Sequence, residues 1–206
     1  MNTDPDRRAS ILAAARVRYA QDGPEKTSLR QIAKDAGVSV ALVYHYFQDK
    51  DELYNACVGE MYQELIGLAQ TAQANLASNK PPEEFLEETV RQGFRFACEQ
   101  RTWVLMLQRR VLDRGGLDPD RVESLREPFL AAAGDALAKA TGQSPAFARL
   151  AIQSIVFLVV RYSLSEQEEL RGFIGTDVAD PVTAIEDHLV DVTFRTFLGR
   201  PSASNS

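Results

Sequence analysis

Apolar residues recur every three to four positions along almost the whole chain, a period that predicts helices rather than strands. Ile11, Ala15 and Tyr19 show this period in the first stretch, and glycine and proline fall mostly between such stretches. We therefore expect an all-α protein of nine helices. Their approximate ranges are 6–21, 29–36, 40–46, 50–78, 83–99, 101–113, 120–140, 145–170 and 181–198.

The stretch from Ser28 to Glu52 contains a series of helix start and stop signals. Ser28 and Gln31 have the spacing of a capping box, and Gly37 can adopt the left-handed conformation that ends a helix. Ser39 then begins a second short helix, and Asp49 with Glu52 repeats the capping-box spacing. Two short helices joined by a tight glycine turn predict a helix-turn-helix.

The second of these short helices has two different faces. At 100° per residue, Val43 and Phe47 lie on one face, whereas Ala41 and His45 lie roughly opposite. The outward face is small, aromatic and polar. It therefore suits a major groove, where base edges form hydrogen bonds and thymine methyl groups accept apolar contacts.

The helices divide into two groups. We expect a three-helix N-terminal domain over residues 1–50, a larger helical bundle over 51–199, and a small, polar, disordered tail over 200–206.

Composition adds one difficulty. The 206 residues are average for a soluble globular protein, but the net charge of −6 is unusual for a protein that binds nucleic acid. The acidic excess lies outside the N-terminal region, because residues 1–55 hold eight basic and eight acidic side chains. A neutral head predicts weak non-specific DNA binding and reliance on a few well-placed contacts.

No pattern predicts catalysis, a metal or a cofactor. Cys57 and Cys98 are expected to be reduced thiols, and neither His45 nor His188 belongs to a known site spacing. His188 and Asp191 could ligate a metal, but a surface or interface pair is the preferred interpretation. The chain does not begin like a signal peptide and has no apolar run of membrane-spanning length, so we expect a cytoplasmic protein without a membrane partner.

Three motifs occur together at characteristic spacing. They are Ile-Ala-x-x-Ala-Gly-Val-Ser over 32–39, Tyr-His-Tyr-Phe over 44–47 and Lys-Asp-Glu-Leu over 50–53. The region 7–55 thereby resembles the DNA-binding domain of the TetR family of transcriptional regulators. The resemblance implies a homodimer that binds a palindromic double-stranded DNA operator, and a C-terminal domain that binds a small-molecule effector and signals through the helix from residue 50. One departure is Ala41, where many members have glycine.

The same resemblance implies a set of DNA-binding residues. Positions expected at phosphates are Thr27, Ser28, Tyr44 and Lys50. Positions expected at bases are Arg30, Val40, Ala41, Leu42 and His45, and Ser39 is included in the set.

The C-terminal region offers weaker signals. Candidate walls of an effector pocket are Phe94, Trp103, Met106, Leu107, Phe129 and Gln153. Each could instead be an ordinary core residue, and Gln153 could lie in the dimer interface. By resemblance, the last two predicted helices form that interface through Ile152, Val156, Val159, Ile185, Leu189 and Val192.

The sequence thus predicts a ligand-responsive regulator, most simply a repressor that an effector releases from its operator. The alternative is a dimeric protein that binds a small molecule or a partner and whose helix-turn-helix is vestigial.

Overall fold

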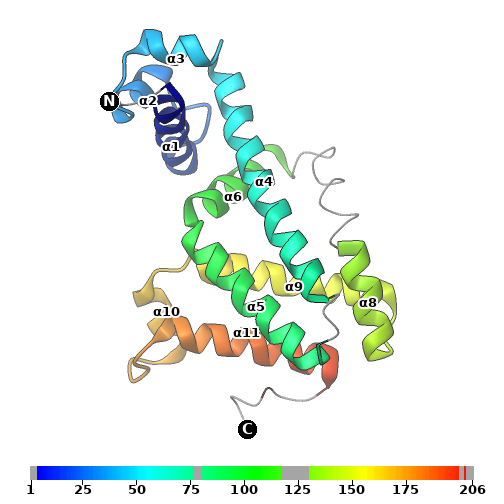
Figure 1. The fold of residues 1–206 in the computed structure, drawn as a ribbon. Helices are drawn as coiled ribbons and strands as arrows, with labels where there is room; N and C mark the ends of the chain where they lie inside the picture. Colours follow the sequence, from blue (N-terminus) through cyan, green and yellow to red (C-terminus); the bar gives the residue numbers. More distant parts are fainter. Residues whose placement is uncertain (1–3, 77–79, 117–129, 200–201, 203–206) are drawn as a thin grey trace. The chain divides into compact units, whose positions relative to one another are not determined.

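The computed structural model describes residues 4–76, 80–116, 130–199 and 202. The described residues form ten helices and no strand, which confirms the all-α prediction but not the count of nine. The helices are α1 (Asp4–Asp22), α2 (Leu29–Asp35), α3 (Val40–Tyr46), α4 (Lys50–Leu76), α5 (Pro82–Glu99), α6 (Arg101–Arg114), α8 (Ala132–Thr141), α9 (Pro145–Ser163), α10 (Gln167–Ile174) and α11 (Pro181–Leu198) (Figure 1). The predicted helix 120–140 begins outside the described residues.

The extra helix arises because the predicted helix 145–170 is two helices. The chain turns after Ser163, and the Ser165 N–H donates to the Tyr162 carbonyl. Arg101 stabilises this break, since one guanidinium nitrogen lies 3.0 Å from the Ser163 carbonyl and another lies 2.7 Å from a Glu166 carboxylate oxygen. Donors from another helix therefore satisfy an acceptor at the end of α9.

The described residues belong to two compact units. The first comprises Met1–Leu65 and Thr102–Asp118, and the second comprises Ile66–Arg101 and Pro119–Ser206. The first unit thus extends beyond residue 50, to include the start of α4 and nearly all of α6. The functional division into 1–50 and 51–199 stays a prediction.

The core of the first unit lies beneath α2 and α3, which Figure 1 shows beside α1. Its fully buried side chains come from four helices. They are Ile11, Leu12, Ala15 and Tyr19 of α1, Ile32 and Ala33 of α2, Val43 of α3, and Leu53, Cys57 and Val58 of α4. This core fixes the mutual positions of the three short helical segments that carry the predicted DNA-binding residues.

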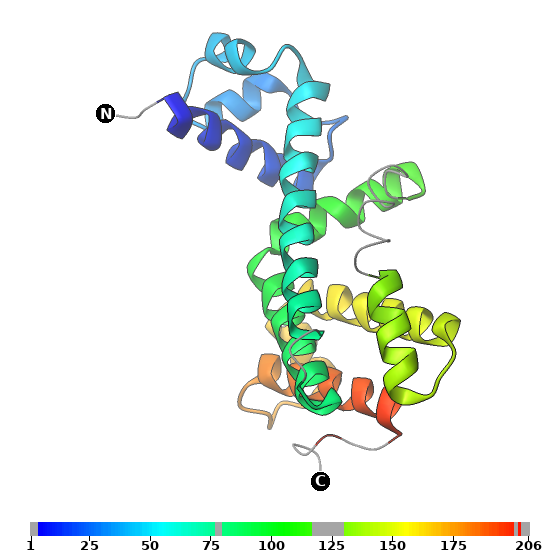
Figure 2. The same ribbon diagram turned by 45° about the vertical axis from the view of Figure 1, so that its right-hand side comes forward.

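The second unit is organised around α11, which packs against α5, α8, α9 and α10 (Figure 2). Leu189 and Val190 of α11 are fully buried, and Phe194 and Phe197 continue the same core toward the helix end. Asp191 of α11 is also buried, and its carboxylate accepts a hydrogen bond from the Ser202 N–H at 3.0 Å. Ser202 is buried, so this residue does not fit the expected disordered tail; the rest of 200–206 lies outside the described residues.

Among the described helices, α9 is long and apolar enough to cross a membrane by length and composition alone. A core helix of a globular protein passes the same test, and Ala148, Ala151 and Ile155 of α9 are buried in the second unit. One such helix is weak evidence for a membrane span.

Candidate nucleic-acid interface

The helix-turn-helix forms through the local signals that the sequence contains. The Gln31 N–H donates to Ser28 Oγ, and the Ser28 N–H donates to Gln31 Oε1, so the predicted capping box is complete. Gly37 adopts φ = +67°, and the next N–H, from Val38, donates to the Ala33 carbonyl at 3.0 Å. These bonds end α2 and set the direction in which the chain enters α3.

The two faces of α3 are as predicted. Val43 and Phe47 are buried, whereas Ala41 and His45 are exposed. Ser39 begins the helix, because its hydroxyl accepts the Leu42 N–H at 3.2 Å. Tyr44 is 57% exposed, an unusual fraction for an aromatic side chain without a partner of its own kind. The outward face of α3 is therefore available to a large partner.

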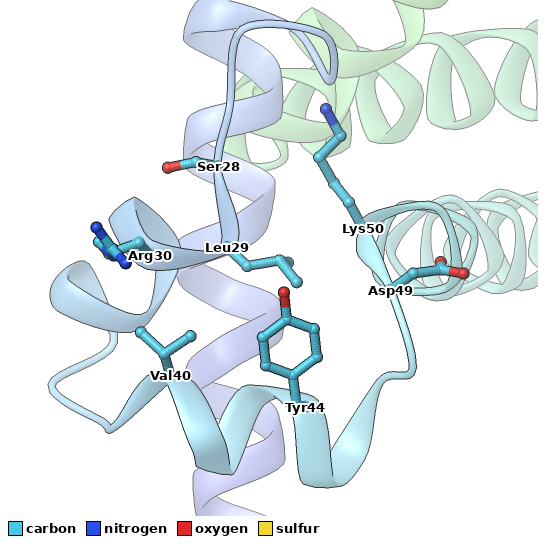
Figure 3. A pocket seen from close by; sticks show the side chains of 7 residues that line it. All are labelled: Ser28, Leu29, Arg30, Val40, Tyr44, Asp49 and Lys50. Atoms are coloured by element: carbon cyan, nitrogen blue, oxygen red, sulfur yellow. The ribbon is translucent and has the colours of Figure 1, made fainter.

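A hollow of about 400 Å³ lies beside α3. It is lined by Ser28, Leu29, Arg30, Val40, Tyr44, Asp49 and Lys50. Figure 3 shows that these residues come from the starts of α2, α3 and α4, with Arg30 and Lys50 on opposite sides of the Tyr44 ring. Two cationic side chains and a phenol around an open hollow are groups that bind phosphate oxygens.

Lys50 is held in place from both ends. Its carbonyl accepts a hydrogen bond from the Tyr19 hydroxyl at 3.3 Å, and its Nζ lies 3.5 Å from the Glu25 carbonyl. Asp49 begins α4 by accepting the Glu52 N–H at 2.8 Å. The Glu52 carboxylate accepts the Gln48 N–H rather than that of Asp49, a small departure from the predicted capping box. The start of α4 is consequently rigid where the hollow needs it.

Sequence reasoning did not assign Leu29 and Asp49 to the site. Leu29 was expected only on the apolar face of its helix, and Asp49 only as a cap. Both line the hollow because they neighbour Ser28 and Lys50 at helix starts, which is the signal that could have identified them.

An ion pair holds α2 on α1. The Arg18 guanidinium donates to both carboxylate oxygens of Asp35, at 2.5 and 3.1 Å. The hydrogen bond from Arg18 lowers the pKa of Asp35, and Asp35 raises the pKa of Arg18. This bidentate contact fixes the orientation of α2, and with it the turn into α3.

Thr27 differs from the prediction. Its side chain is 2% exposed, and its hydroxyl donates to the Gly23 carbonyl at 2.8 Å. A hydroxyl that faces the interior does not meet a phosphate, so we withdraw the phosphate contact predicted for the Thr27 hydroxyl. The remaining residues of the DNA-binding set stay predictions.

The candidate pocket residues do not form one described group. Trp103, Met106 and Leu107 belong to the first unit, where the Arg16 guanidinium lies 4.6 Å from the Trp103 ring centre. Phe94 and Gln153 belong to the second unit, and Phe94 is fully buried in its core. Phe129 lies outside the described residues. The effector pocket therefore stays a prediction.

The predicted dimer interface needs a correction. Ile185 and Leu189 are buried in the core of their own chain, so neither side chain can contact a second subunit. Ile152, Val159 and Val192 are partly buried against the same core, whereas Val156 remains 39% exposed. The large exposed side chains of α9 are Phe147, Leu150 and Phe157, which the prediction omitted.

The described residues contain no group of three or more histidine, cysteine, aspartate or glutamate side chains placed to hold a metal ion. The pair His188 and Asp191 shows why. The His188 ring contacts Tyr162 edge to face, and Asp191 is occupied by Arg195 and Ser202.

Residues 11–57 match the family model described as bacterial regulatory proteins, tetR family. The chain is 34% identical over 98 residues to the HTH-type transcriptional regulator BetI of Brucella anthropi, which covers 42% of this chain and 50% of that protein. It is 27% identical over 215 residues to BetI of Brucella canis, covering 98% and 97% of the two chains.

The crystal structure of a TetR-like transcriptional regulator from a Rhodococcus species is similar to this chain. The TM-score is 0.71 at 21% identity, with 96% of this chain and 99% of that chain covered. At this identity the likeness concerns the fold. Three further relatives are matched over only 24–37% of their lengths.

Proposed function

Because the chain belongs to the TetR family of transcriptional regulators, we propose that it is a homodimer that binds double-stranded DNA through α3 and represses transcription. A small-molecule effector bound in the second unit lowers the affinity for DNA. The proposal involves no catalysed reaction, and it places the protein in the cytoplasm, where its DNA partner is.

The observation that carries the proposal is the exposed face of α3 beside the hollow. Tyr44, Ala41 and His45 face outward, and Lys50 and Arg30 border the same surface. Side chains of α3 can read base edges in the major groove while the cations at the starts of α2 and α4 contact the phosphates. A vestigial helix-turn-helix would need neither the three helix caps nor the exposed Tyr44.

Two copies related by a two-fold axis would read a palindromic operator. Their α3 helices would then lie about 34–36 Å apart, one turn of DNA. A palindrome is required because each head presents the same residues to its own half-site.

Helix α4 provides a path for the effector signal. It begins with Lys50 at the hollow, runs for 27 residues, and belongs to the second unit from Ile66 onward. A regular helix transmits displacement along its axis, so a tilt imposed on its second half moves Lys50 relative to the phosphates. The resulting loss of DNA affinity is an allosteric coupling between two sites.

Fluorescence anisotropy with labelled DNA from the region upstream of the chain's own gene tests the proposal. Wild-type protein is expected to bind this DNA more tightly than a random duplex of equal length. Tyr44→Ala is expected to weaken specific binding by about 1–3 kcal/mol per head. Lys50→Ala is expected to lower the slope of log affinity against log salt by about one per head.

Lys139→Ala is the matched control, because it removes an exposed cation from α8 in the other unit. Equal effects of Lys50→Ala and Lys139→Ala would show that only net charge matters and would remove Lys50 from the site. If the wild-type protein prefers no gene-proximal DNA over random sequence, the alternative of a small-molecule or partner-binding protein with a vestigial helix-turn-helix replaces the proposal.

A further inference from the structure

Helix α9 exposes an apolar stripe on the second unit. Leu150 is 69% exposed and Phe157 is 64% exposed, and seven residues of helix bring these two side chains to nearly the same angle around the axis. Phe147 extends the stripe at the start of the helix. These three side chains expose on the order of 300 Å², a size at which apolar patches mark interaction sites.

The charges beside this stripe are already neutralised within the chain. Arg149 pairs with Asp135 of α8 at 2.7 Å, and Arg161 pairs with Glu169 of α10. A surface with the same charges can therefore approach the stripe without placing two unpaired cations together. This favours an identical surface as the partner, whereas a lipid phase would have to accommodate both ion pairs.

The stripe is also self-complementary. The midpoint between Leu150 and Phe157 falls between Gln153 and Ser154, two adjacent polar residues in an otherwise apolar stretch. In an antiparallel pair of α9 helices crossing at this point, Leu150 meets Phe157 of the partner subunit, and the reverse contact forms by symmetry. Ser154 is small enough to let the two backbones approach.

We propose that a second copy of this chain packs antiparallel on α9, with the two-fold axis passing between Gln153 and Ser154. This inference rests on the homodimer of the proposed function and specifies its contact. The Ser154 hydroxyl donates to the Leu150 carbonyl at 2.9 Å, which leaves its oxygen lone pairs to accept the amide N–H of Gln153 of the partner subunit. A polar pair inside an apolar contact fixes the register of the two helices.

A charge-exchange experiment tests the register. Sedimentation measures the dimer dissociation constant of the wild type and of Leu150→Glu, Phe157→Lys and the double variant. Each single variant is expected to weaken the dimer at least tenfold. The double variant is expected to recover at least tenfold over either, because the new charges meet across the axis. Leu150→Glu with Val156→Lys is the control that should not recover, since Val156 lies about 100° away from Phe157 around the helix.

Cysteine cross-linking tests the position of the axis without disturbing the apolar contacts. In a Cys98→Ser background, Ser154→Cys is expected to form a disulfide-linked dimer on mild oxidation. Ala146→Cys is the control, because the two copies of this exposed residue would lie about 22 Å apart along the helices, beyond disulfide reach. Wild-type circular dichroism verifies that each variant is folded.

The outcomes separate the two proposals. A wild-type protein that sediments as a monomer at micromolar concentration refutes the homodimer and with it this contact. A wild-type dimer without recovery in the double variant and without the Ser154→Cys cross-link refutes the α9 axis but leaves the homodimer intact. Wild-type protein that is monomeric in buffer but binds phosphatidylglycerol vesicles through Phe157 would assign the stripe to a lipid surface instead.

Discussion

Replacing Gly37 by alanine tests whether backbone conformation alone holds the turn between α2 and α3. Gly37 has φ = +67°, and an added Cβ would meet no atom within 4 Å. The cost is therefore conformational rather than steric. A left-handed alanine costs about 1–2 kcal/mol, and the loss of unfolded-chain entropy offsets about 0.4–1 kcal/mol of this. We expect Gly37→Ala to destabilise the first unit by about 1 kcal/mol.

Gly67 of α4 provides the matched control. An added Cβ would again meet nothing within 4 Å, but the backbone there is regular helix. The same methyl group should therefore stabilise the protein by about 0.8–1 kcal/mol, which is the difference in helix propensity between alanine and glycine. Gly37→Asn should cost less than Gly37→Ala, because asparagine adopts the left-handed conformation more readily.

Urea unfolding measures both effects. The single tryptophan, Trp103, is buried in the first unit, so its fluorescence reports the unit that contains Gly37. Circular dichroism follows the whole helical content and reports Gly67→Ala. Effects of the same sign in Gly37→Ala and Gly67→Ala would refute the conformational argument. A loss of DNA affinity larger than the loss of stability would show that the turn also sets the angle of α3.

Three further predictions concern the same unit. Asp35→Asn should lower the urea midpoint of Trp103 fluorescence at neutral pH, because the pair with Arg18 stabilises the folded state. Since folding lowers the pKa of Asp35, the difference between wild type and variant should vanish as the pH falls below the ordinary value of 3.8. Ser28→Ala should destabilise by about 1 kcal/mol through loss of the cap, whereas Ser10→Ala, within α1, should stay near neutral; similar losses would refute the capping role. Burial raises the pKa of Cys57 to about 12, so its thiol should resist maleimide at pH 8 until urea unfolds the chain, and rapid labelling in the native state would contradict this.

The helix-turn-helix was predictable because its signals are local. Ser28 caps a residue three positions away, Gly37 acts through its own φ, and α3 has one apolar and one polar face. Such features need no knowledge of the rest of the chain. The fate of the Thr27 hydroxyl was not predictable in this way, since its acceptor, the Gly23 carbonyl, is positioned by the turn after α1.

The second unit was harder to predict because its determinants are distant or degenerate. The break after Ser163 contains neither glycine nor proline, and the donor that stabilises it is Arg101, 62 residues earlier in the chain. Helix α9 is apolar nearly all round, so periodicity could not show which side is buried. The prediction chose the side of Ile152 and Val159, whereas the structure exposes that of Leu150 and Phe157.

The chain passes between its two units inside helices, at Leu65–Ile66 in α4 and at Arg101–Thr102 in α6. A hybrid regulator that borrows this head must therefore be joined within a helix instead of a loop. One inserted residue at such a junction would turn everything beyond it by about 100° and advance it by about 1.5 Å. Seven inserted residues would nearly restore the angle but add about 10 Å of length. Exchange of heads between relatives is thus limited to junctions that conserve both the residue count and the helical phase.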